Sequence, residues 1–438
     1  MLTSPFLLII IQGMNDNHSG RDWIYKRRWL EGSLAGMVKR HPVVVVTGPR
    51  QVGKSTLLHH AKPVHQWRYH SLDGLDVQEQ AQRDPTALWA GVNHVVIDEA
   101  QRVPALLLAV KRAVDRDRNC RFVLSGSANM LLMQKVSESL AGRAVYLVLR
   151  PLTLGEWEGK NAPNILSTLL AGELPLEGHV PTGGDPLALA WRGFMPALFW
   201  LGSGEEGVVE WWNGYVTTYL ERDLRALSQV SLLTDFRRVM ALAALRTGQL
   251  INQSELARDS GVSQPTVHRY LNLLEISMLL DRVPAFSSGR TTRLLKSPKL
   301  YWDDPGLTAF LMGHYTAVEI KDEREAGALF ENLVLLHLRS LADLLTPPGR
   351  IYYWRTVSGT EVDFVVEQGR RLVAIEVKLA ATPHYRDIKG LKRFMSEYDR
   401  CKAGVLIYAG DEIVQLGERI VALPWQILSQ ESTLPSAD

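Results

Sequence analysis

Short runs of β-branched and other apolar residues, each followed by a loop and a helix-forming stretch, mark the first third of the chain. The runs "HPVVVV", "NHVVID" and "CRFVLS" read as buried strands, because they are too short for helices and are bounded by Gly, Asn or Ser. Strands that alternate with helices are typical of a parallel α/β domain. The pattern therefore predicts an α/β domain in this region.

The middle of the chain changes to a helical period. "EWWNGYVTTYLERDLRALSQV" carries an apolar stripe with Tyr215 and Tyr219, opposite a charged face. "LINQSELARDSGVSQPTVHRYLNLLEISMLL" then reads as helix, turn at Gly261, and helix, with Ser263 as N-cap and Pro265 in the first turn. We expect a helix-turn-helix, followed by a wing hairpin within "DRVPAFSSGRTTRLLKSPKLYWDD".

The last third begins with a long apolar helix in "EREAGALFENLVLLHLRSLADLL", in which Glu331 is an acid inside the apolar run. "GRIYYWRTVSGTEVDFVVEQGRRLVAIEVKLA" predicts three strands, "YRDIKGLKRFMSEY" a helix and "AGVLIYAG" a strand. Alternation in the strand that ends at Lys378 places Glu376 and Lys378 on one face and Val373, Ile375 and Val377 on the other.

A chain of 438 residues is too long for one compact core. A stretch rich in Gly, Pro and Leu between Asn161 and Asp185 indicates a connection between domains. The predicted organisation is a tail, an α/β nucleotide domain, a linker with a docking segment, a helical winged-helix-like domain and a C-terminal α/β domain, at 1–22, 23–160, 161–205, 206–315 and 320–438.

The amino-acid composition excludes few classes of protein. The formal net charge of +2 gives no global sign of nucleic-acid binding, so any such surface must be local. Cys120 and Cys401 lie far apart without metal-like spacing, and we expect buried thiols in a reducing compartment. The N-terminal run "PFLLIII" is too short to span a bilayer and lacks signal-peptide features, so we expect a cytoplasmic protein without a membrane partner.

The loop GPRQVGKS lies between a predicted strand and a predicted helix, which is the context a phosphate-binding loop requires. Its backbone N–H groups and the helix N-terminus can surround phosphates, Lys54 can reach the β- and γ-phosphates, and Ser55 can hold Mg²⁺. A glycine turn without ligand is the alternative. The predicted nucleotide-binding residues here are Gly48, Pro49, Arg50, Gln51, Val52, Gly53, Lys54, Ser55 and Thr56.

Two adjacent acids end the next apolar strand. Asp98 can bind Mg²⁺ through water and Glu99 can polarise the water that attacks the γ-phosphate, although solvated acids at a helix start are the alternative. Ser127 follows a further strand and either senses the γ-phosphate or makes a local turn. Arg143 is either an arginine finger, in cis or across a subunit interface of a homo-oligomer, or a cation at a helix end.

Four segments together resemble the AAA-type ATPase domain of a widespread prokaryotic family that carries a C-terminal domain of uncharacterised function. These are "GPRQVGKSTLL", "VVIDEAQRVP", "LSGSANMLL" and "ESLAGRAVYLVLRPLTLGEW". "YVTTYLERDLRALSQV" and "GALFENLVLLHL" are similar to downstream segments of that family. The resemblance implies an ATP-binding and ATP-hydrolysing protein with ATP and Mg²⁺ as cofactors.

The helix-turn-helix suggests double-stranded DNA as a partner, through residues 251–299. Exposed positions early in the second helix suit phosphate or base-edge contacts, and basic residues of the wing can reach a backbone. Contacts with another protein are the alternative. The positions involved are Gln264, Thr266, His268, Arg269, Arg290, Arg293, Lys296 and Lys299.

The order of C-terminal elements resembles the restriction-endonuclease-like fold. In that resemblance Glu331 matches the acid of the first helix, Asp363 the metal aspartate, and Glu376 with Lys378 the E-x-K pair. Asp363, Glu376 and Glu331 would hold Mg²⁺, and Lys378 would activate the attacking water. The alternative is a structural bridge between Asp363 and Lys378 in a domain without activity.

These features lead to two hypotheses. In one, ATP hydrolysis repositions a DNA-binding or nuclease-like C-terminal module. In the other, ATP occupancy switches binding to DNA or to a protein, and no bond other than that of the γ-phosphate is cut.

Overall fold

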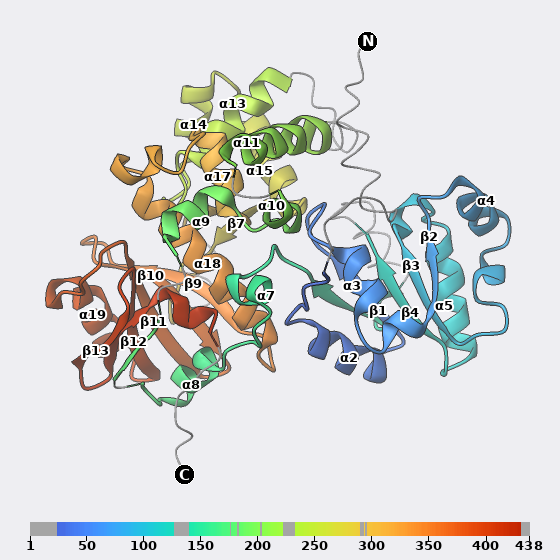
Figure 1. Cartoon of the computed structure of the whole chain (residues 1–438), viewed down its shortest axis with the longest axis horizontal. Coiled ribbons are helices and arrows are strands. Elements are labelled where there is room, and N and C mark those ends of the chain that lie inside the picture. Colours follow the sequence, from blue (N-terminus) through green and yellow to red (C-terminus); the bar gives the residue numbers. More distant parts are fainter. Residues whose placement is uncertain are drawn as a thin grey trace.

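The computed structural model describes residues 24–126, 140–175, 177–181, 184–201, 204–221, 233–289, 293 and 296–430. The predicted tail therefore lies outside the described residues. Figure 1 shows two bodies: an N-terminal α/β body on the right, and a larger body in which a helical region lies above a C-terminal sheet. This arrangement agrees with the expected α/β domain followed by a helical region and a second α/β part.

The N-terminal body is built on a parallel sheet of five strands in the order β2-β3-β4-β1-β5. Because all strands run the same way, the loops that follow β1, β3 and β4 meet at one edge of the sheet. The strands are β1 (Val43–Thr47), β2 (Arg68–Ser71), β3 (His94–Asp98), β4 (Arg121–Ser125) and β5 (Ala144–Val148).

Helices cover both faces of this sheet, which explains why its strands are apolar on both sides. Val44 and Val46 face a cluster with α2 and α3, whereas Val43 and Val45 face a cluster with α5. The helices are α2 (Glu31–Arg40), α3 (Lys54–His60), α4 (Leu75–Arg83) and α5 (Leu106–Arg116), with 3₁₀ turns at Val64–Gln66, Pro85–Trp89 and Ala100–Arg102.

The helical region contains the predicted helix, turn and helix. Gly261 ends α14 in the left-handed conformation (φ 68°), and the Ser263 hydroxyl accepts a hydrogen bond from the Thr266 N–H at the start of α15. The elements of this region are α9 (Pro186–Arg192), α10 (Pro196–Trp200), α11 (Glu205–Gly214), a π-helix (Tyr215–Glu221), α13 (Leu233–Ala244), α14 (Gln253–Ser260), α15 (Gln264–Ile276), β7 (Leu280–Val283), β8 (Lys299–Trp302) and α17 (Pro305–Met312).

The C-terminal sheet has seven strands in the order β6-β13-β14-β12-β11-β10-β9. The pairs β11-β12 and β12-β14 are parallel and the others antiparallel. The strands are β6 (Gly178–His179), β9 (Arg350–Arg355), β10 (Glu361–Gln368), β11 (Arg371–Lys378), β12 (Cys401–Tyr408), β13 (Glu412–Gly417) and β14 (Ile420–Pro424). The predicted order of helix, three strands, helix and strand is confirmed by α18, β9 to β11, α19 and β12.

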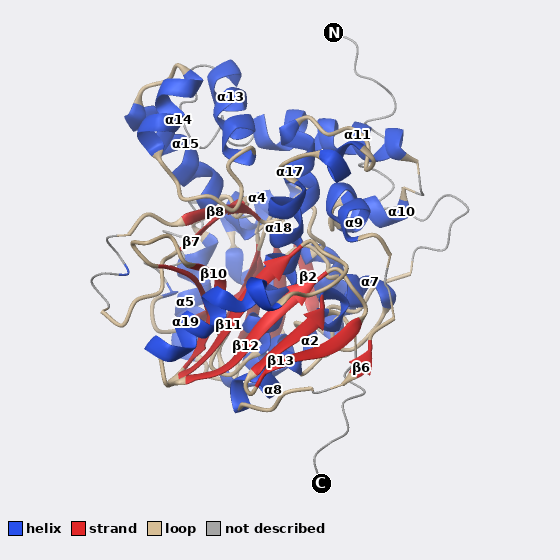
Figure 2. Cartoon of the chain, turned by 90° about the vertical axis from the view of Figure 1, so that its left-hand side faces the viewer, coloured by secondary structure: helices blue, strands red, loops and turns tan. Residues whose placement is uncertain are grey.

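Two helices cover opposite faces of this sheet. α18 (Ala326–Leu344) packs on the face that carries Val373, Ile375 and Val377, and α19 (Lys389–Glu397) packs on the face of Leu372 and Ala374. The predicted alternation along β11 is confirmed. Figure 2 shows the strands of this sheet below the helical region, with α18 between the two. Short 3₁₀ turns occur at Glu319–Asp322, Tyr385–Ile388 and Trp425–Leu428.

The predicted division of residues 161–438 is wrong in two respects. The stretch 161–205 is not a linker: α8 (Ile165–Ala171) packs on β11 and β12, and β6 forms an edge of the sheet through β13. The helical region and the C-terminal sheet also share one continuous apolar core around α18. Elements of five to seven residues are too short to show a period in the sequence, which is why this stretch looked irregular.

Two smaller expectations concern the thiols and membranes. Both Cys120 and Cys401 are buried free thiols, as expected. In the described part of the chain, no helix combines the length and the apolar character that crossing a membrane requires.

Candidate nucleotide site and C-terminal carboxylate cluster

The loop after β1 has the backbone that a phosphate cradle needs. A Cβ at Gly48 would lie 2.1 Å from the Leu149 carbonyl oxygen, so only glycine allows this close approach. Gly53 has a φ of 93° directly before α3, where it turns the chain into the helix. The N-terminus of α3 therefore opens on the loop, with its unpaired N–H groups available to an anion.

Lys54 lies buried inside this loop. Its ammonium donates hydrogen bonds to the carbonyl oxygens of Gly48 (3.1 Å) and Pro49 (2.7 Å). Burial lowers its pKa to about 8, against the effect of Glu99 and Asp98, which raise it. Because weak acceptors hold the lysine, phosphate oxygens can replace the two carbonyl groups at little cost.

Asp98 is fixed at the end of β3 by hydroxyl groups from both neighbouring strands. Tyr69 on β2 donates to its Oδ2 at 2.6 Å, and Ser125 on β4 donates to Oδ1. The Ser55 hydroxyl, the first of α3, lies close to that of Tyr69. One tyrosine thus connects the two side chains that the sequence predicts around Mg²⁺.

Glu99 follows Asp98 in a left-handed conformation (φ 54°), which is costly for a residue with a Cβ. Burial and the charge of Asp98 raise its pKa, while Lys54 lowers it. Glu99 is therefore close to the lysine and the aspartate, as a residue that orients a water must be.

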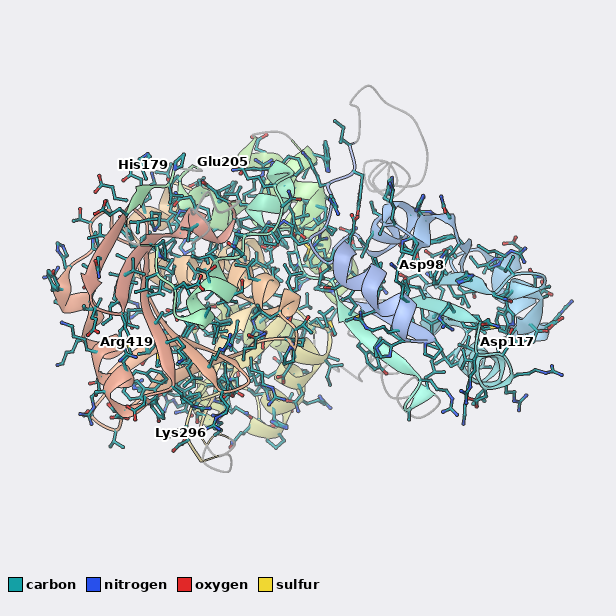
Figure 3. All side chains as sticks on the ribbon, turned by 90° about the horizontal axis from the view of Figure 1, so that it is seen from below. Asp98, Asp117, His179, Glu205, Lys296 and Arg419 are labelled. Atoms are coloured by element: carbon teal, nitrogen blue, oxygen red, sulfur yellow. The ribbon has the colours of Figure 1, made fainter. Side chains whose placement is uncertain are left out.

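The other two residues predicted for this site are Ser127 and Arg143. Ser127 lies outside the described residues. Arg143 immediately precedes β5, at the amino ends of the parallel strands, whereas the phosphate loop follows their carboxyl ends. The length of a five-residue strand, about 15 Å, separates the two positions. It forms a bidentate pair with Asp115 at the end of α5. Figure 3 shows this end of the body at Asp117, on the far side from Asp98. The prediction that Arg143 acts as an arginine finger in cis is wrong, whereas an arginine finger across a subunit interface stays a prediction.

Arg28, which sequence reasoning missed, ties the phosphate loop to the rest of the protein. It is buried, and its guanidinium donates to the Val52 carbonyl of the loop (3.0 Å), to the Arg150 carbonyl (2.6 Å) and to Glu156 (3.1 Å). Glu156 belongs to the short helix α7 (Leu154–Glu158), which lies between the two bodies (Figure 1).

Arg150 continues this connection into the larger body. Its guanidinium lies 3.0 Å from Asp303, at the end of β8, and 2.9 Å from Asp343 on α18. Nearby, the N–H of Leu154 donates to Nε2 of His337 on α18 at 3.1 Å. The two bodies are therefore joined by charged and polar contacts that begin at the phosphate loop.

An apolar hollow lies beside the loop. Tyr25, Gly53, Thr56, Pro196 and Trp200 are among its lining residues. Tyr25 stacks on His60 of α3, with ring centroids 4.4 Å apart. The hollow adjoins the helix that begins at Lys54 and offers aromatic and apolar surface.

The C-terminal site brings together all four residues predicted for it. Asp363 on β10 and Glu376 on β11 are buried, and Lys378 lies 2.7 Å from Glu376. Asp363 accepts the N–H of Val377 at 2.9 Å. Burial and the charge of Asp363 raise the pKa of Glu376 to about 8, and the same two causes raise that of Glu331 to about 7. Lys378 thus pairs with Glu376, and the predicted alternative of a bridge to Asp363 is not formed.

Lys299, predicted to contact DNA, instead lies inside this cluster. Its ammonium is 3.4 Å from Glu331 and 3.6 Å from Asp363, and it also pairs with Glu361. Burial lowers its pKa, but these carboxylates outweigh burial and raise it. The prediction was wrong because β8 turns its first residue inwards, next to Tyr301, which hydrogen-bonds Glu331.

The cluster in this arrangement does not fit a metal ion. Within the described ranges, no three His, Cys, Asp or Glu side chains are grouped so that they could hold one. Mg²⁺ requires oxygen ligands at about 2.1 Å around a common centre, whereas here an ammonium nitrogen holds the carboxylates at ion-pair distances.

Among the wing residues that the structure describes, Arg293 is also turned away from a basic surface. Arg293 pairs with Glu367 on β10 at 2.8 Å, and its guanidinium lies over the Phe286 ring. The N–H of Phe286 donates to the Tyr353 carbonyl of β9, so the segment docks on the C-terminal sheet. Arg290 lies outside the described residues, and Lys296 is exposed at the rim of the molecule (Figure 3). The expected role of Arg293 on DNA is wrong.

The exposed face of α15 carries mixed groups. Gln264, His268 and Arg269 are exposed and Thr266 is half-buried, as a recognition helix requires. His268 contacts Gln253 and Asn272, however, and acids balance the arginines nearby. The ion pairs are Arg246 with Asp259, Arg258 with Glu255 and Asp259, and Arg282 with Glu275.

The phosphate loop, the fixed aspartate at the end of β3 and the parallel sheet define the N-terminal body as an AAA-type P-loop domain. A family model described as "AAA domain" matches residues 40–158. Two further models, both described as domains of unknown function, match residues 186–317 (DUF8612) and 326–428 (DUF4143).

The chain belongs to the same family as two uncharacterised mycobacterial proteins. Mb2031c of Mycobacterium bovis and Rv2008c of Mycobacterium tuberculosis are each 31% identical to it over 405 residues, which cover 92% of this chain and 84% of theirs. Among solved structures, the Walker-type ATPase PABY2304 of Pyrococcus abyssi is 16% identical, covers 66% of this chain and 96% of its own, and has a TM-score of 0.42. A likeness of that size supports no conclusion about activity.

Proposed function

We propose that the protein hydrolyses ATP with Mg²⁺ at the N-terminal site. The observation that carries the proposal is the group of Ser55, Tyr69 and Asp98 next to a buried Lys54, in which Tyr69 donates a hydrogen bond to Asp98. A hydroxyl at a helix N-terminus, a fixed carboxylate and a lysine inside a glycine-bounded loop are the groups that phosphoryl transfer needs.

Each residue has a distinct role in this proposal. Ser55 and Asp98 would hold Mg²⁺, which supplies positive charge to the phosphate oxygens. Lys54 leaves the carbonyl oxygens of Gly48 and Pro49 and binds the β- and γ-phosphates. Glu99 orients the attacking water, and burial raises its pKa, which makes it a stronger base than an exposed carboxylate.

The apolar hollow suits the base of the nucleotide. Its position at Gly53 and Thr56 adjoins the first turn of α3, and Tyr25 and Trp200 provide aromatic surface. Aromatic and apolar groups favour a planar ring system over a free phosphate, which supports a nucleoside triphosphate as the ligand.

A Lys54→Ala variant tests the assignment. We expect ATP turnover to be abolished, because the variant loses the ammonium group proposed to bind the β- and γ-phosphates. Lys39→Ala, which removes an exposed lysine from α2, is the matched control and should retain turnover. Unchanged turnover in purified Lys54→Ala would exclude this site as the origin of the activity.

We further propose that nucleotide state is coupled to the C-terminal site, which resembles that of restriction-endonuclease-like enzymes. Arg28 and Arg150 support the coupling, because they connect the Val52 carbonyl of the loop to Asp303 and Asp343 of the larger body. A loop that moves when it binds phosphate changes the position of both arginines.

Nuclease activity is tested with Mg²⁺ or Mn²⁺ on single- and double-stranded DNA and RNA. Cleavage by the wild type that is lost in Asp363→Ala and in Lys378→Ala, and retained in the exposed control Glu418→Ala, supports a nuclease. A wild type that leaves every substrate intact, with and without ATP, removes nuclease activity from the proposal.

A second candidate is a switch that cuts no nucleic acid. It is favoured by one observation, the insertion of Lys299 between the acids that would hold a metal ion. In this case ATP occupancy controls binding to DNA or a protein. The N-terminal face of α15 is the proposed contact for such a partner, because Arg269 is exposed there.

A further inference from the structure

The C-terminal cluster contains more charge than the predicted motif accounts for. Four carboxylates, from Glu331 on α18, Glu361 and Asp363 on β10 and Glu376 on β11, face the ammonium groups of Lys299 and Lys378. Lys378 pairs with Glu376 near the surface. Lys299 pairs with the other three, and Arg355 also pairs with Glu361.

Lys299 occupies the position of a central cation. Its side chain is only 4% exposed, and its single nitrogen pairs with carboxylates from two different elements. A lysine ammonium is a compact point charge with three N–H donors, so it can satisfy three acceptors at once. A charge this deeply buried is stable only because it is paired.

One oxygen of the cluster has no partner. Glu376 is 8% exposed, and its Oε2 receives no hydrogen bond from any described residue. A buried carboxylate oxygen without a donor costs free energy, and such an atom in a native site indicates a missing proton, water or ion. The cluster thus keeps ligand capacity that the two lysines do not use.

We propose that Lys299 is a resident cation that excludes divalent metal ions from this site, and that it must leave before Mg²⁺ or Mn²⁺ can bind the same carboxylates. The proposal rests on the proposed function of the C-terminal site as a metal site. It gives Lys299 a regulatory role, because an ammonium attached to a neighbouring strand is removed by moving that strand.

The position of Lys299 on β8 connects it to the nucleotide body. β8 begins at Lys299 and ends at Trp302, and the next residue, Asp303, pairs with Arg150. The strand that carries the internal cation is therefore held at its other end by the arginine that follows the last strand of the nucleotide domain. A shift of Arg150 acts directly on this strand.

Lys299→Met tests the proposal in the full chain without ATP or nucleic acid. Methionine keeps the length of the side chain and removes its charge. The probe is Mn²⁺, followed by titration calorimetry and by the paramagnetic resonance of free Mn²⁺. Lys296→Met, an exposed lysine three residues earlier, is the matched control.

We expect Lys299→Met to gain one Mn²⁺ site at least tenfold tighter than any site in the wild type or in Lys296→Met. The site should be lost again in Lys299→Met combined with Asp363→Asn. Wild-type protein that binds Mn²⁺ as tightly as Lys299→Met, with sensitivity to Asp363→Asn, overturns the exclusion by Lys299. If Lys299→Met gains no Mn²⁺ site, the proposal that these carboxylates can bind a divalent cation is refuted.

Thermal unfolding provides the second readout. Without Lys299, three carboxylates lose a buried cationic partner, so the melting temperature should fall and Mn²⁺ should restore it. A variant that unfolds without metal should fold when Mn²⁺ is added, and one that stays unfolded at every Mn²⁺ concentration overturns the proposal. If Mn²⁺ binds as expected but no nucleic acid is cut, the proposed nuclease activity is excluded, whereas the proposed role of Lys299 is retained.

Discussion

Arg28 and Arg27 are adjacent in the sequence but differ sharply in their surroundings, which allows a matched test of the junction. The Arg28 side chain is 5% exposed and donates to Glu156 and to carbonyl oxygens of the loop and of the segment after β5. The Arg27 side chain is 72% exposed and lies 3.5 Å from Glu31. We compare Arg28→Met with Arg27→Met.

In Arg28→Met, the buried carboxylate of Glu156 loses its cation, although the N–H groups of Trp29 and Thr153 still donate to it. Breaking a buried ion pair by removing one partner costs about 3–5 kcal/mol, and the retained N–H donors place our expectation near the lower value, about 3 kcal/mol. The exposed pair of Arg27 contributes about 0–1 kcal/mol.

Urea unfolding, followed by circular dichroism and by tryptophan fluorescence, measures the difference in the free energy of unfolding. Because the protein has two bodies, the first transition is the relevant one. We expect Arg28→Met to weaken ATP binding as well, because Val52 loses its donor. If the two variants differ by less than about 1 kcal/mol, Arg28 does not hold the junction and the reasoning from its burial is refuted.

Two further predictions concern the loop and the junction. Gly48→Ala should lower the affinity for ATP more than tenfold, because the added Cβ would lie 2.1 Å from the Leu149 carbonyl oxygen. Gly32→Ala is the control, because a Cβ at Gly32 would have no atom within 4 Å. An equal affinity for ATP in the two variants would contradict the close approach at Gly48. Burial lowers the pKa of His337 to about 4. Below about pH 6.5 the unfolded chain therefore binds a proton at this residue that the folded chain does not bind. The stability present above pH 6.5 is lost as the pH falls towards 4. This amounts to about 3 kcal/mol, and His337→Gln should flatten the pH dependence of unfolding over that range; a slope equal to that of the wild type would exclude His337 as its source.

Local sequence patterns were sufficient for the elements whose geometry depends on neighbours in the chain. The strand, loop and helix around Lys54 follow from "VVVVTGPRQVGKST", and the caps of α15 follow from Ser263 and Pro265. The face of β11 that carries Glu376 follows from strict alternation. In each case a single period or cap fixes the direction of the side chain.

Contacts between distant segments could not be predicted in this way. Lys299 looked like a wing residue because it lies among other basic residues, and only the packing of β8 against α18 turns it into the cluster. One signal was available: Lys299 shares a strand face with Tyr301, a residue expected to be buried. Arg28 gave no signal, since its partners are more than 20 residues away in the sequence.

Glu99→Gln, with ATP affinity and turnover measured on the same preparation, tests the central claim most directly. The substitution keeps the size of the side chain and removes the group proposed to orient water, whereas Lys54 and the loop remain. We predict that Mg²⁺-ATP binds with an affinity within about threefold of the wild type while turnover falls by at least 10²-fold, the scale of a lost general base. Turnover that stays close to the wild-type rate, or a wild type without Mg²⁺-dependent turnover, would contradict the account.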